Sequence, residues 1–450
     1  MSTPKRIWIN LMYILLALTV VLSLFTASAV KAKAHTPKNV IVMIADGRGF
    51  NHLLADSYYQ EGKADTQIYT HFPVKYAMST YSYYCDYDPS LAWSDFEYVK
   101  TCFTDSAAAA TAMATGFKTY DAAIGVDVDG NPVKNVLEAA EEQGKSTGVI
   151  TTVPFSHATP AGFVAHDINR DDYGGIARDM INLSAADVIM GAGNPWYDDN
   201  GALMVSPIYS YIDAATWDAL VAGTSGNDAD ADGDFDHWTL IQTRAQFQAL
   251  MHGPTPQRVI GIAQVNDTLQ QLRSGDVNAD PYMVPFTQSV PTLVEMTKAA
   301  LNILDDDTDG LFLMIEGGAV DWASHLHESG RMIEEHIGFD LAVEAVLDWV
   351  QANSNWGETL LIVTSDHENG YVLGPGSDPT WEPVVNYGAG NLPGMDWYHT
   401  NHVNTLVPFF AKGDDARWFR DYATLTDPVR GLYLDNTSIA KVIFNLLEGK

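Results

Sequence analysis

The sequence predicts an α/β fold: a central, mostly parallel sheet with helices on both faces. Two observations support this prediction. First, short apolar runs of strand length alternate with amphipathic segments of helix length along most of the chain, and a parallel sheet needs such crossover helices. Second, the strand-like runs are apolar throughout instead of alternating apolar and polar residues, as expected where helices cover both faces of a sheet.

The expected strands follow one another at regular intervals. Each is a continuous apolar run, and they cover residues 39–46, 147–153, 186–193, 258–264, 310–318 and 359–367. Between them, residues 133–144 form an amphipathic pattern that ends at Gly144, which favours a helix with a glycine stop. Residues 291–304 and 336–353 show the same helical periodicity.

Two stretches interrupt the alternation. Residues 195–245 are rich in Asp, Gly, Asn and Trp, and residues 370–400 contain many turn residues. We interpret both as surface insertions in one domain that covers residues 35–450, with ligands expected beyond the carboxyl ends of the strands.

Residues 1–34 have the pattern of a secretory signal peptide. Lys5 and Arg6 precede a long apolar stretch, and Ala32-Lys33-Ala34 offers a small-residue cleavage site. An uncleaved membrane anchor is the alternative, since the apolar stretch is long enough to span a bilayer. We therefore expect a periplasmic or secreted protein with no membrane contact after cleavage.

The charge of the chain excludes one class of partner. The formal net charge is −32, and it becomes −36 once the four Lys and Arg of residues 1–34 are subtracted. Nucleic acid is not an expected partner, because binding its phosphates requires Lys and Arg. The chain has two cysteines, Cys85 and Cys102, which in an exported protein are expected to pair; two buried thiols are the alternative.

Acidic residues and histidines collect at the ends of the expected strands. Asp46 closes the first strand, Glu316 another, and Asp366-His367 a third. Asp321 and His325 are four residues apart, so on a helix they would share one face. Because carboxyl ends of parallel strands meet at one sheet edge, these residues predict a site for divalent metals such as Zn²⁺ and Mg²⁺.

The segment FTDSAAAATAMATG at 103–116 allows two interpretations. Asp105 and Ser106 before a run of alanines are typical of a helix start, where either side chain acts as a cap. Alternatively, the Ser106 hydroxyl lies at a helix N-terminus that favours a bound phosphate, and a metal would make it a nucleophile. The local sequence does not decide between them.

Two acidic runs resemble calcium loops. Residues 305–316 match the EF-hand pattern, but the apolar residues 311–315 predict a strand where an EF-hand needs a helix. We therefore assign Glu316 to the catalytic site. Residues 228–236 lack the final Glu, so an additional Ca²⁺ site and a solvated loop both remain open. A calcium-stabilised binding protein without catalysis is thus an alternative function.

Six segments in order resemble the alkaline phosphatases. They are NVIVMIADGRG, TDSAAAATAMATGFKTYDAAIGVD, HATPAGFVAHDINR, MIEGGAVDWASH, IVTSDHENG and NHVNTLVPFFAKG, and the resemblance runs from about residue 38 to 447. It implies hydrolysis of small phosphate monoesters through a phosphoserine. A phosphodiesterase of the same superfamily is the alternative, and family members are often homodimers.

The resemblance also implies roles for individual residues. Ser106 matches the nucleophile, Asp105 the residue that orients a phosphate-binding arginine, and Arg170 that arginine. Two zinc ions and one magnesium ion are implied. The zinc site at the serine matches Asp46, Asp366 and His367. The zinc site at the leaving oxygen matches Asp321, His325 and His402. The magnesium site matches Asp46, Thr159 and Glu316, with His157 beside it.

Some positions depart from the family pattern. Counting six residues back from the proline of the family's Val-Pro pair, Pro408, selects His402, and His399 is the alternative ligand. His157 and Trp322 stand where some members have Asp and Lys, which leaves the identity and occupancy of the third metal open. Arg48 and Ala45 are less usual in the family, and the sequence does not explain them.

Overall fold

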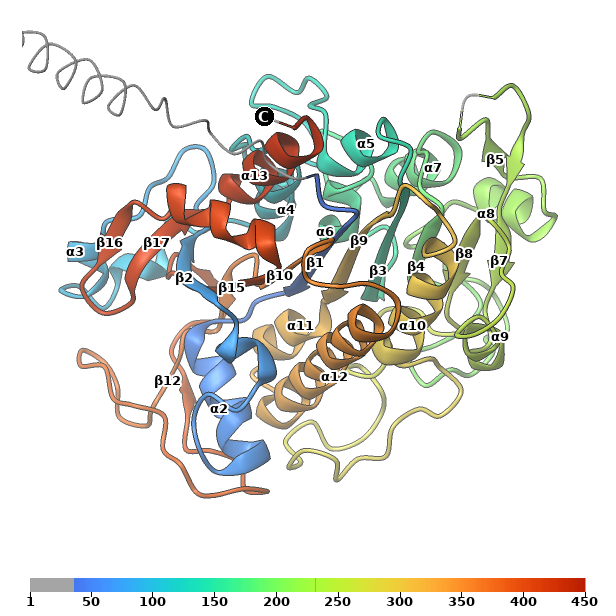
Figure 1. Ribbon diagram of the computed structural model, residues 1–450. Helices are drawn as coiled ribbons and strands as arrows, with labels where there is room; N and C mark the ends of the chain where they lie inside the picture. Colours follow the sequence, from blue (N-terminus) through green and yellow to red (C-terminus); the bar gives the residue numbers. More distant parts are fainter. Residues whose placement is uncertain (1–35, 231, 450) are drawn as a thin grey trace, which may run out of the picture.

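The computed structural model describes residues 36–230 and 232–449. Its main sheet has eleven strands in the order β16-β17-β2-β15-β10-β1-β9-β3-β4-β8-β7 (Figure 1). The strands from β10 to β7 are parallel to one another. In sheet order they are β10 (Thr359–Thr364), β1 (Asn39–Ala45), β9 (Leu311–Gly317), β3 (Ser146–Pro154), β4 (Val188–Ala192), β8 (Val259–Ile262) and β7 (Thr239–Ile241). The predicted mostly parallel sheet is confirmed.

The other edge of the sheet is mixed. Strand β15 is antiparallel to both β10 and β2, while β17 is parallel to β2 and antiparallel to β16. These strands are β15 (Val407–Lys412), β2 (Val74–Ser79), β17 (Gly431–Asp435) and β16 (Leu425–Asp427). None of these four strands was predicted from the sequence.

Helices cover both faces of the sheet. Alternate residues of β1 point to opposite faces, so Val40 and Val42 enter one core and Ile41 and Met43 the other. The first core is packed by α4 (Ser106–Thr115), α5 (Val136–Glu141), α6 (Ala158–Gly162), α7 (Tyr173–Asn182), α8 (Ala214–Val221) and α13 (Thr437–Leu447). The second is packed by α2 (Phe50–Glu61), α9 (Arg244–Ala249), α10 (Leu293–Leu304) and α12 (Ser329–Asn353).

The predicted insertions are only partly surface excursions. Within 195–245, the residues of β7 pair with β8 and so belong to the main sheet, whereas β5 (Gly226–Asn227) and β6 (Asp236–His237) form a separate small ladder. Within 370–400, β12 (Val372–Leu373) pairs with β13 (Asp396–Trp397). The predicted helix 336–353 begins earlier, at Ser329.

Shorter elements complete the described chain. Between β2 and α4 lie α3 (Pro89–Ala92) and the 3₁₀ helix η2 (Tyr98–Lys100), and the predicted disulfide between Cys85 and Cys102 is present there. The other 3₁₀ helices are η1 (Ile68–His71) and η3 (Asp414–Asp421). Among the described residues, no helix is long and apolar enough to cross a bilayer. The predicted signal peptide, 1–34, lies outside the described residues.

The strand register brings the predicted polar residues to one edge. Ile44 of β1 is level with Glu316 of β9 on one side and with Thr364 of β10 on the other. As a result, Asp46 and Asp366, which follow these strands directly, emerge beside Glu316. The next element, α11 (Ala319–His325), starts at the same edge. A two-stranded ladder of β11 (Glu368–Asn369) with β14 (His402–Val403) follows Asp366 and His367 and brings His402 to this edge.

Candidate active site

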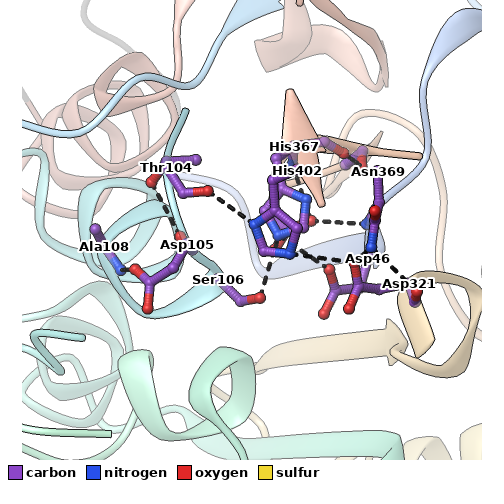
Figure 2. A network of polar contacts seen from close by, with 12 residues as sticks. Asp46, Thr104, Asp105, Ser106, Ala108, Asp321, His367, Asn369 and His402 are labelled. Carbon is purple, nitrogen blue, oxygen red and sulfur yellow. Dashed lines mark hydrogen bonds and ion pairs between the residues drawn. The ribbon is translucent and has the colours of Figure 1, made fainter. Parts of the chain in front are cut away.

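Two groups of side chains that could hold a metal ion share one histidine at this sheet edge. In the first, ligand atoms of Asp46, Asp366 and His367 lie within 4.8 Å of one another. In the second, the same limit holds for Asp321, His367 and His402. Figure 2 shows Asp46, Asp321, His367 and His402 pointing toward a common centre, with Ser106 beside it.

The first group is fully buried and tightly packed. His367 Nε2 lies 3.4 Å from Asp46 Oδ1 and 3.2 Å from Asp366 Oδ2. Burial and the nearby ring of His402 lower the pKa of His367, so its ring is neutral and can bind a cation. Gly47, at φ +72°, lets the loop pass Asp321, because an added Cβ would lie 2.9 Å from the Cα of Asp321.

His325 lies beside the second group and forms with Asp321 the helical pair predicted from spacing. Asp321 and His325 lie on one face of α11, with Asp321 Oδ2 and His325 Nε2 3.5 Å apart. His402 Nε2 is 3.4 Å from Asp321 Oδ1 and 3.1 Å from His325 Nε2. Burial opposes ionisation, but His325 and His402 outweigh it and lower the pKa of Asp321. Asp321 is therefore ionised.

Neighbouring groups fix the orientation of this second group. The Nδ1 atom of His402 lies 2.9 Å from the backbone oxygen of Thr104, a contact that places the proton on Nδ1 and leaves Nε2 free to bind a cation. The side-chain amide of Asn369 donates to Asp321 Oδ1 at 2.6 Å. Neither residue was predicted from the sequence. Thr104 takes part through its backbone oxygen, which leaves no sequence signal. Asn369 lies three positions after Asp366, but its contact is with Asp321, 48 positions away.

Ser106 is the first residue of α4 and faces the shared histidine. Its Oγ lies 3.2 Å from His367 Nε2. Asp105 caps the helix by accepting a hydrogen bond from the backbone N–H of Ala108 at 2.9 Å. The helix-start interpretation is confirmed, with Asp105 as the cap. The Ser106 hydroxyl lies at the positive end of the helix, and its role as a nucleophile stays a prediction.

Arg170 reaches the same place from the loop between α6 and α7. One guanidinium nitrogen donates to Asp105 Oδ2 at 3.0 Å, and the other lies 3.1 Å from His157 Nε2. Burial disfavours the charged form, but the Asp105 carboxylate outweighs this and raises the pKa of Arg170. A protonated, oriented guanidinium beside a serine hydroxyl is suited to binding an oxyanion such as phosphate.

A third group lies behind the first. The hydroxyl of Thr151 donates to Glu316 Oε2, and Glu316 Oε1 and Thr159 Oγ1 are buried without a hydrogen-bond partner among the described residues. His157, which caps α6, stacks on Tyr173. Burial and Arg170 lower the pKa of His157 to about 3, so its ring is neutral.

The carboxylates of the first and third groups are buried close to one another. Burial and Asp366 raise the pKa of Asp46 well above its usual range, and burial raises the pKa of Glu316 to about 7 and that of Asp366 to about 6. Both carboxylate oxygens of Asp46 and Oδ2 of Asp366 are buried without a hydrogen-bond partner in the described chain. Such a donor set fits bound divalent cations, since buried carboxylates need pairing or metal.

A cavity of about 510 Å³ opens onto these groups. Its polar wall is formed by Ser106, His157, Arg170, Asp321, His325, Asn401 and His402. Its other wall is apolar and is formed by Leu272, Trp322 and Leu326. The structure thus brings together all the site residues predicted from sequence.

Two predicted alternatives lie elsewhere. His399, the alternative to His402, belongs to neither group of ligands, and its ring lies 6.1 Å from that of Phe103. Asp305 to Asp309 form the predicted turn between α10 and β9, and the strand predicted at 311–315 is confirmed, so no EF-hand helix begins within this acidic run. Carboxylates of Asp228, Asp230 and Asp236 do gather at the surface, within 4.8 Å of one another.

The chain is similar in sequence to alkaline phosphatases. The family model described as "Alkaline phosphatase" matches residues 37–405. Alkaline phosphatase 3 of Bacillus subtilis is 31% identical over 359 residues, which cover 77% of this chain and 65% of that protein. Alkaline phosphatase H of Pseudomonas aeruginosa is also 31% identical, over 73% of this chain and 69% of its own length. The match thus spans about two thirds of these relatives.

A solved structure supports the same relationship. The alkaline phosphatase of the Antarctic bacterium TAB5 is 26% identical, with a TM-score of 0.61, and the match covers 92% of this chain and 99% of that one. A variant of the TAB5 enzyme in which a histidine is replaced by glutamate holds Mg in its M3 site.

Proposed function

Because the chain belongs to the alkaline phosphatase family, we propose that it hydrolyses small phosphate monoesters through a phosphoserine at Ser106. The observation that carries this proposal is the position of the Ser106 hydroxyl. It lies at the start of α4, 3.2 Å from His367 Nε2, in the same cavity as the guanidinium of Arg170. This arrangement supports the assignment of Ser106 as the nucleophile, of Arg170 as the group that binds the oxyanion, and of the two neighbouring groups as metal ligands.

The donor sets fit two zinc ions and one magnesium ion. Asp46, Asp366 and His367 would hold the zinc ion nearer to Ser106, and Asp321, His325 and His402 the other. Glu316, Thr159 and Asp46 would hold magnesium, whose preference for oxygen ligands suits that set. When bound, these ions supply activation of the serine hydroxyl and of water, and they neutralise charge on the leaving oxygen.

The protein's own groups define how the substrate is held. Arg170 would bind two non-bridging oxygens of the phosphoryl group, because its planar fork is fixed by Asp105. The Ser106 oxygen then attacks phosphorus as the alcohol departs, and water later displaces Ser106 to release inorganic phosphate. Recognition of the phosphoryl group alone implies a broad range of monoesters.

His157 adds no negative charge to the third site. Its ring is uncharged and its Nδ1 is buried without a partner among the described residues. In the TAB5 enzyme, a glutamate in place of a histidine accompanies Mg in the M3 site. We infer that His157 lowers magnesium affinity here, since it supplies no negative charge.

A phosphodiesterase remains the alternative function. Arg170 argues against it, because a guanidinium that binds two non-bridging oxygens favours the doubly charged phosphoryl group of a monoester.

We also infer export to the periplasm or medium from the pattern of residues 1–34.

Steady-state hydrolysis of 4-nitrophenyl phosphate tests the proposal. We expect zinc- and magnesium-dependent activity that chelation removes and that Ser106→Ala lowers by at least roughly a thousandfold. Ser184→Ala, which removes a hydroxyl that donates to the backbone oxygen of Met180 in α7, should leave activity unchanged. Full activity of Ser106→Ala would overturn the mechanism. Faster hydrolysis of bis(4-nitrophenyl) phosphate than of the monoester would favour the diesterase.

A further inference from the structure

Arg48 is fully buried although it carries a charge. None of its surface is exposed, and within the described chain no carboxylate oxygen lies within the 4.0 Å of an ion pair with its guanidinium. A buried charge without compensation costs much free energy. The surroundings of Arg48 must therefore supply this compensation in another way.

Three elements provide it. One guanidinium nitrogen of Arg48 donates to the Tyr69 hydroxyl at 2.9 Å, and the other donates to the backbone oxygen of Thr364 at 2.8 Å. The guanidinium also lies over the rings of Tyr69 and Phe339, 5.3 and 5.1 Å from their centroids. Arg48 is thus held in one orientation between a phenol, a ring and a strand end.

The negative charge reaches Arg48 through Tyr69. The Tyr69 hydroxyl, which accepts from Arg48, donates to Asp340 Oδ1 at 2.6 Å. Burial and Asp340 raise the pKa of Tyr69, so the phenol stays protonated and continues to donate. The phenol therefore relays the charge of Asp340 to Arg48.

A second buried pair stands behind Asp340. His336 Nδ1 lies 3.1 Å from Asp56 Oδ2 and 3.8 Å from Asp340 Oδ1. Burial opposes protonation, but Asp56 and Asp340 outweigh it and raise the pKa of His336 to about 9. The cluster thus combines the cations Arg48 and His336 with two acidic side chains.

The carboxylates of this cluster are occupied by donors, which argues against a metal site. Asp56 accepts from the amides of Gln60 and Gln67 in addition to His336. Asp340 accepts from Tyr69 and Gln60. N–H and O–H groups point at all four carboxylate oxygens, which suits protonated partners better than a metal ion.

Arg48 lies in the loop that carries Asp46, and it contacts the loop that carries Asp366 and His367. Thr364, whose oxygen it binds, ends β10 and immediately precedes Ser365, Asp366 and His367. The backbone N–H of Arg48 donates to Ser365 Oγ at 2.9 Å, and that hydroxyl donates to the His367 oxygen at 2.7 Å.

The neighbouring residue reinforces the link. The backbone N–H of Gly47 donates to Asp366 Oδ1 at 3.1 Å, and Asp46 precedes Gly47. The loop after β1 and the loop after β10 are therefore joined by both the backbone and the side chain of this short segment.

We propose that Arg48 is a positioning residue that fixes the distance between Asp46 and the Asp366-His367 pair by binding the Thr364 oxygen, while Tyr69 and Asp340 hold its guanidinium in place. This rests on the proposed function, in which Asp46, Asp366 and His367 bind zinc. Arg48 contacts neither substrate nor metal. It acts on catalysis through the separation of ligands whose placement sets metal affinity and reactivity.

Arg48→Met and Tyr69→Phe test the proposal in the full chain. Met removes both side-chain hydrogen bonds, whereas Phe keeps the ring and removes only the hydroxyl. We expect zinc release to a chelator to accelerate by roughly 10- to 100-fold in Arg48→Met and by roughly fivefold in Tyr69→Phe. kcat should fall in parallel, with KM within about twofold, because Arg170 is untouched.

The double variant gives the sharper result. Since Tyr69 acts through Arg48, adding Tyr69→Phe to Arg48→Met should change zinc release no further. Tyr87→Phe is the matched control: its hydroxyl donates to Asp427 at 2.8 Å, and its loss should leave zinc release and kcat at the wild-type values.

Two outcomes would overturn the proposal: wild-type zinc release in both single variants, or independent, multiplying effects in the double variant. If Arg48→Met does not fold, the comparison of zinc release between Tyr69→Phe and its control Tyr87→Phe tests the proposal. Absence of phosphatase activity in the wild type would instead remove the proposed function, and zinc release would still report on the position of the ligands.

Discussion

The Oδ2 atom of Asp105 lies 3.0 Å from a guanidinium nitrogen of Arg170, although the two residues are 65 positions apart. The other oxygen of the same carboxylate caps α4 at the backbone N–H of Ala108. One side chain therefore fixes both the helix that presents Ser106 and the guanidinium that faces it.

Replacing Asp105 with alanine should loosen Arg170 and weaken phosphate binding. We expect the inhibition constant of inorganic phosphate and KM to rise by roughly tenfold, because an unoriented guanidinium loses its two-point contact. Inhibition of 4-nitrophenyl phosphate hydrolysis measures this. Asp213→Ala is the control, since Asp213 also caps a helix and pairs with an arginine, Arg178, but at the surface. Equal effects of the two substitutions would contradict the assignment.

Glu316→Gln should impair the third metal site, whereas Asp307→Asn, in the acidic turn before Glu316, should not. The substitution removes the charge of a fully buried ligand, so we expect a loss of bound magnesium and at least a roughly tenfold loss of activity. Asp307→Asn should change neither, because Asp307 only accepts a backbone N–H within the turn. Metal content by mass spectrometry, together with kcat, distinguishes the two. Loss of activity in Asp307→Asn would revive the calcium-loop interpretation.

His402→Ala should remove a zinc ligand, whereas His399→Ala should not. The contact of His402 Nδ1 with the Thr104 oxygen leaves Nε2 facing Asp321, and His399 lies outside both groups. We expect His402→Ala to retain one zinc equivalent fewer than the wild type after dialysis and to lose roughly a hundredfold in activity. Wild-type zinc content in His402→Ala, with a deficit in His399→Ala, would reverse the choice made from spacing.

The stabilising contribution of His336 should depend on pH. Its pKa is about 9 in the folded protein and about 6.5 in an unfolded chain, so the folded state binds this proton more tightly. The contribution is complete below pH 6.5 and is lost as the pH rises through 9. The difference in Tm between the zinc-loaded wild type and His336→Gln should therefore shrink from pH 7 to pH 10. A difference that grows over this range would show that His336 is not protonated when folded.

The strand ends were the most predictable part of the molecule. Asp46, Glu316 and Asp366 each follow a continuous apolar run, and parallel strands in register necessarily bring such ends together. Assignment of individual ligands to particular metals came from the family resemblance and not from these patterns, because spacing alone does not tell zinc from magnesium.

The unpredicted features depend on contacts between distant segments. Strand β2, with Lys75 and Tyr76 in its middle, lacks the continuous apolar run of the central strands, and its pairing with β15 and β17 has no local signal. Arg48 was unexplained because its partners Tyr69 and Thr364, and Asp340 behind Tyr69, come from three other elements. Only the folded chain reveals why a buried cation is tolerated there.

The apolar wall of the cavity should favour substrates with apolar leaving groups. Leu272, Trp322 and Leu326 line the cavity that also contains Ser106, and the side chain of Leu326 is 57% exposed and so available to a ligand. An aryl or alkyl group placed there would remove apolar surface from water, which stabilises the complex, whereas glycerol has little apolar surface to bury. We therefore expect a higher kcat/KM for phenyl phosphate than for glycerol 2-phosphate, beyond the difference due to leaving-group acidity.

Leu326→Ser isolates this contribution, because the acidity of the leaving group is the same for both enzymes. The ratio of kcat/KM for phenyl phosphate to that for glycerol 2-phosphate should fall by roughly three- to tenfold in the variant, the range expected for losing a few methyl or methylene contacts. Leu183→Ser, at an exposed residue that follows α7, should leave the ratio unchanged. If Leu326→Ser lowers kcat/KM equally for both esters, Leu326 supports the fold of the site and does not contact the leaving group.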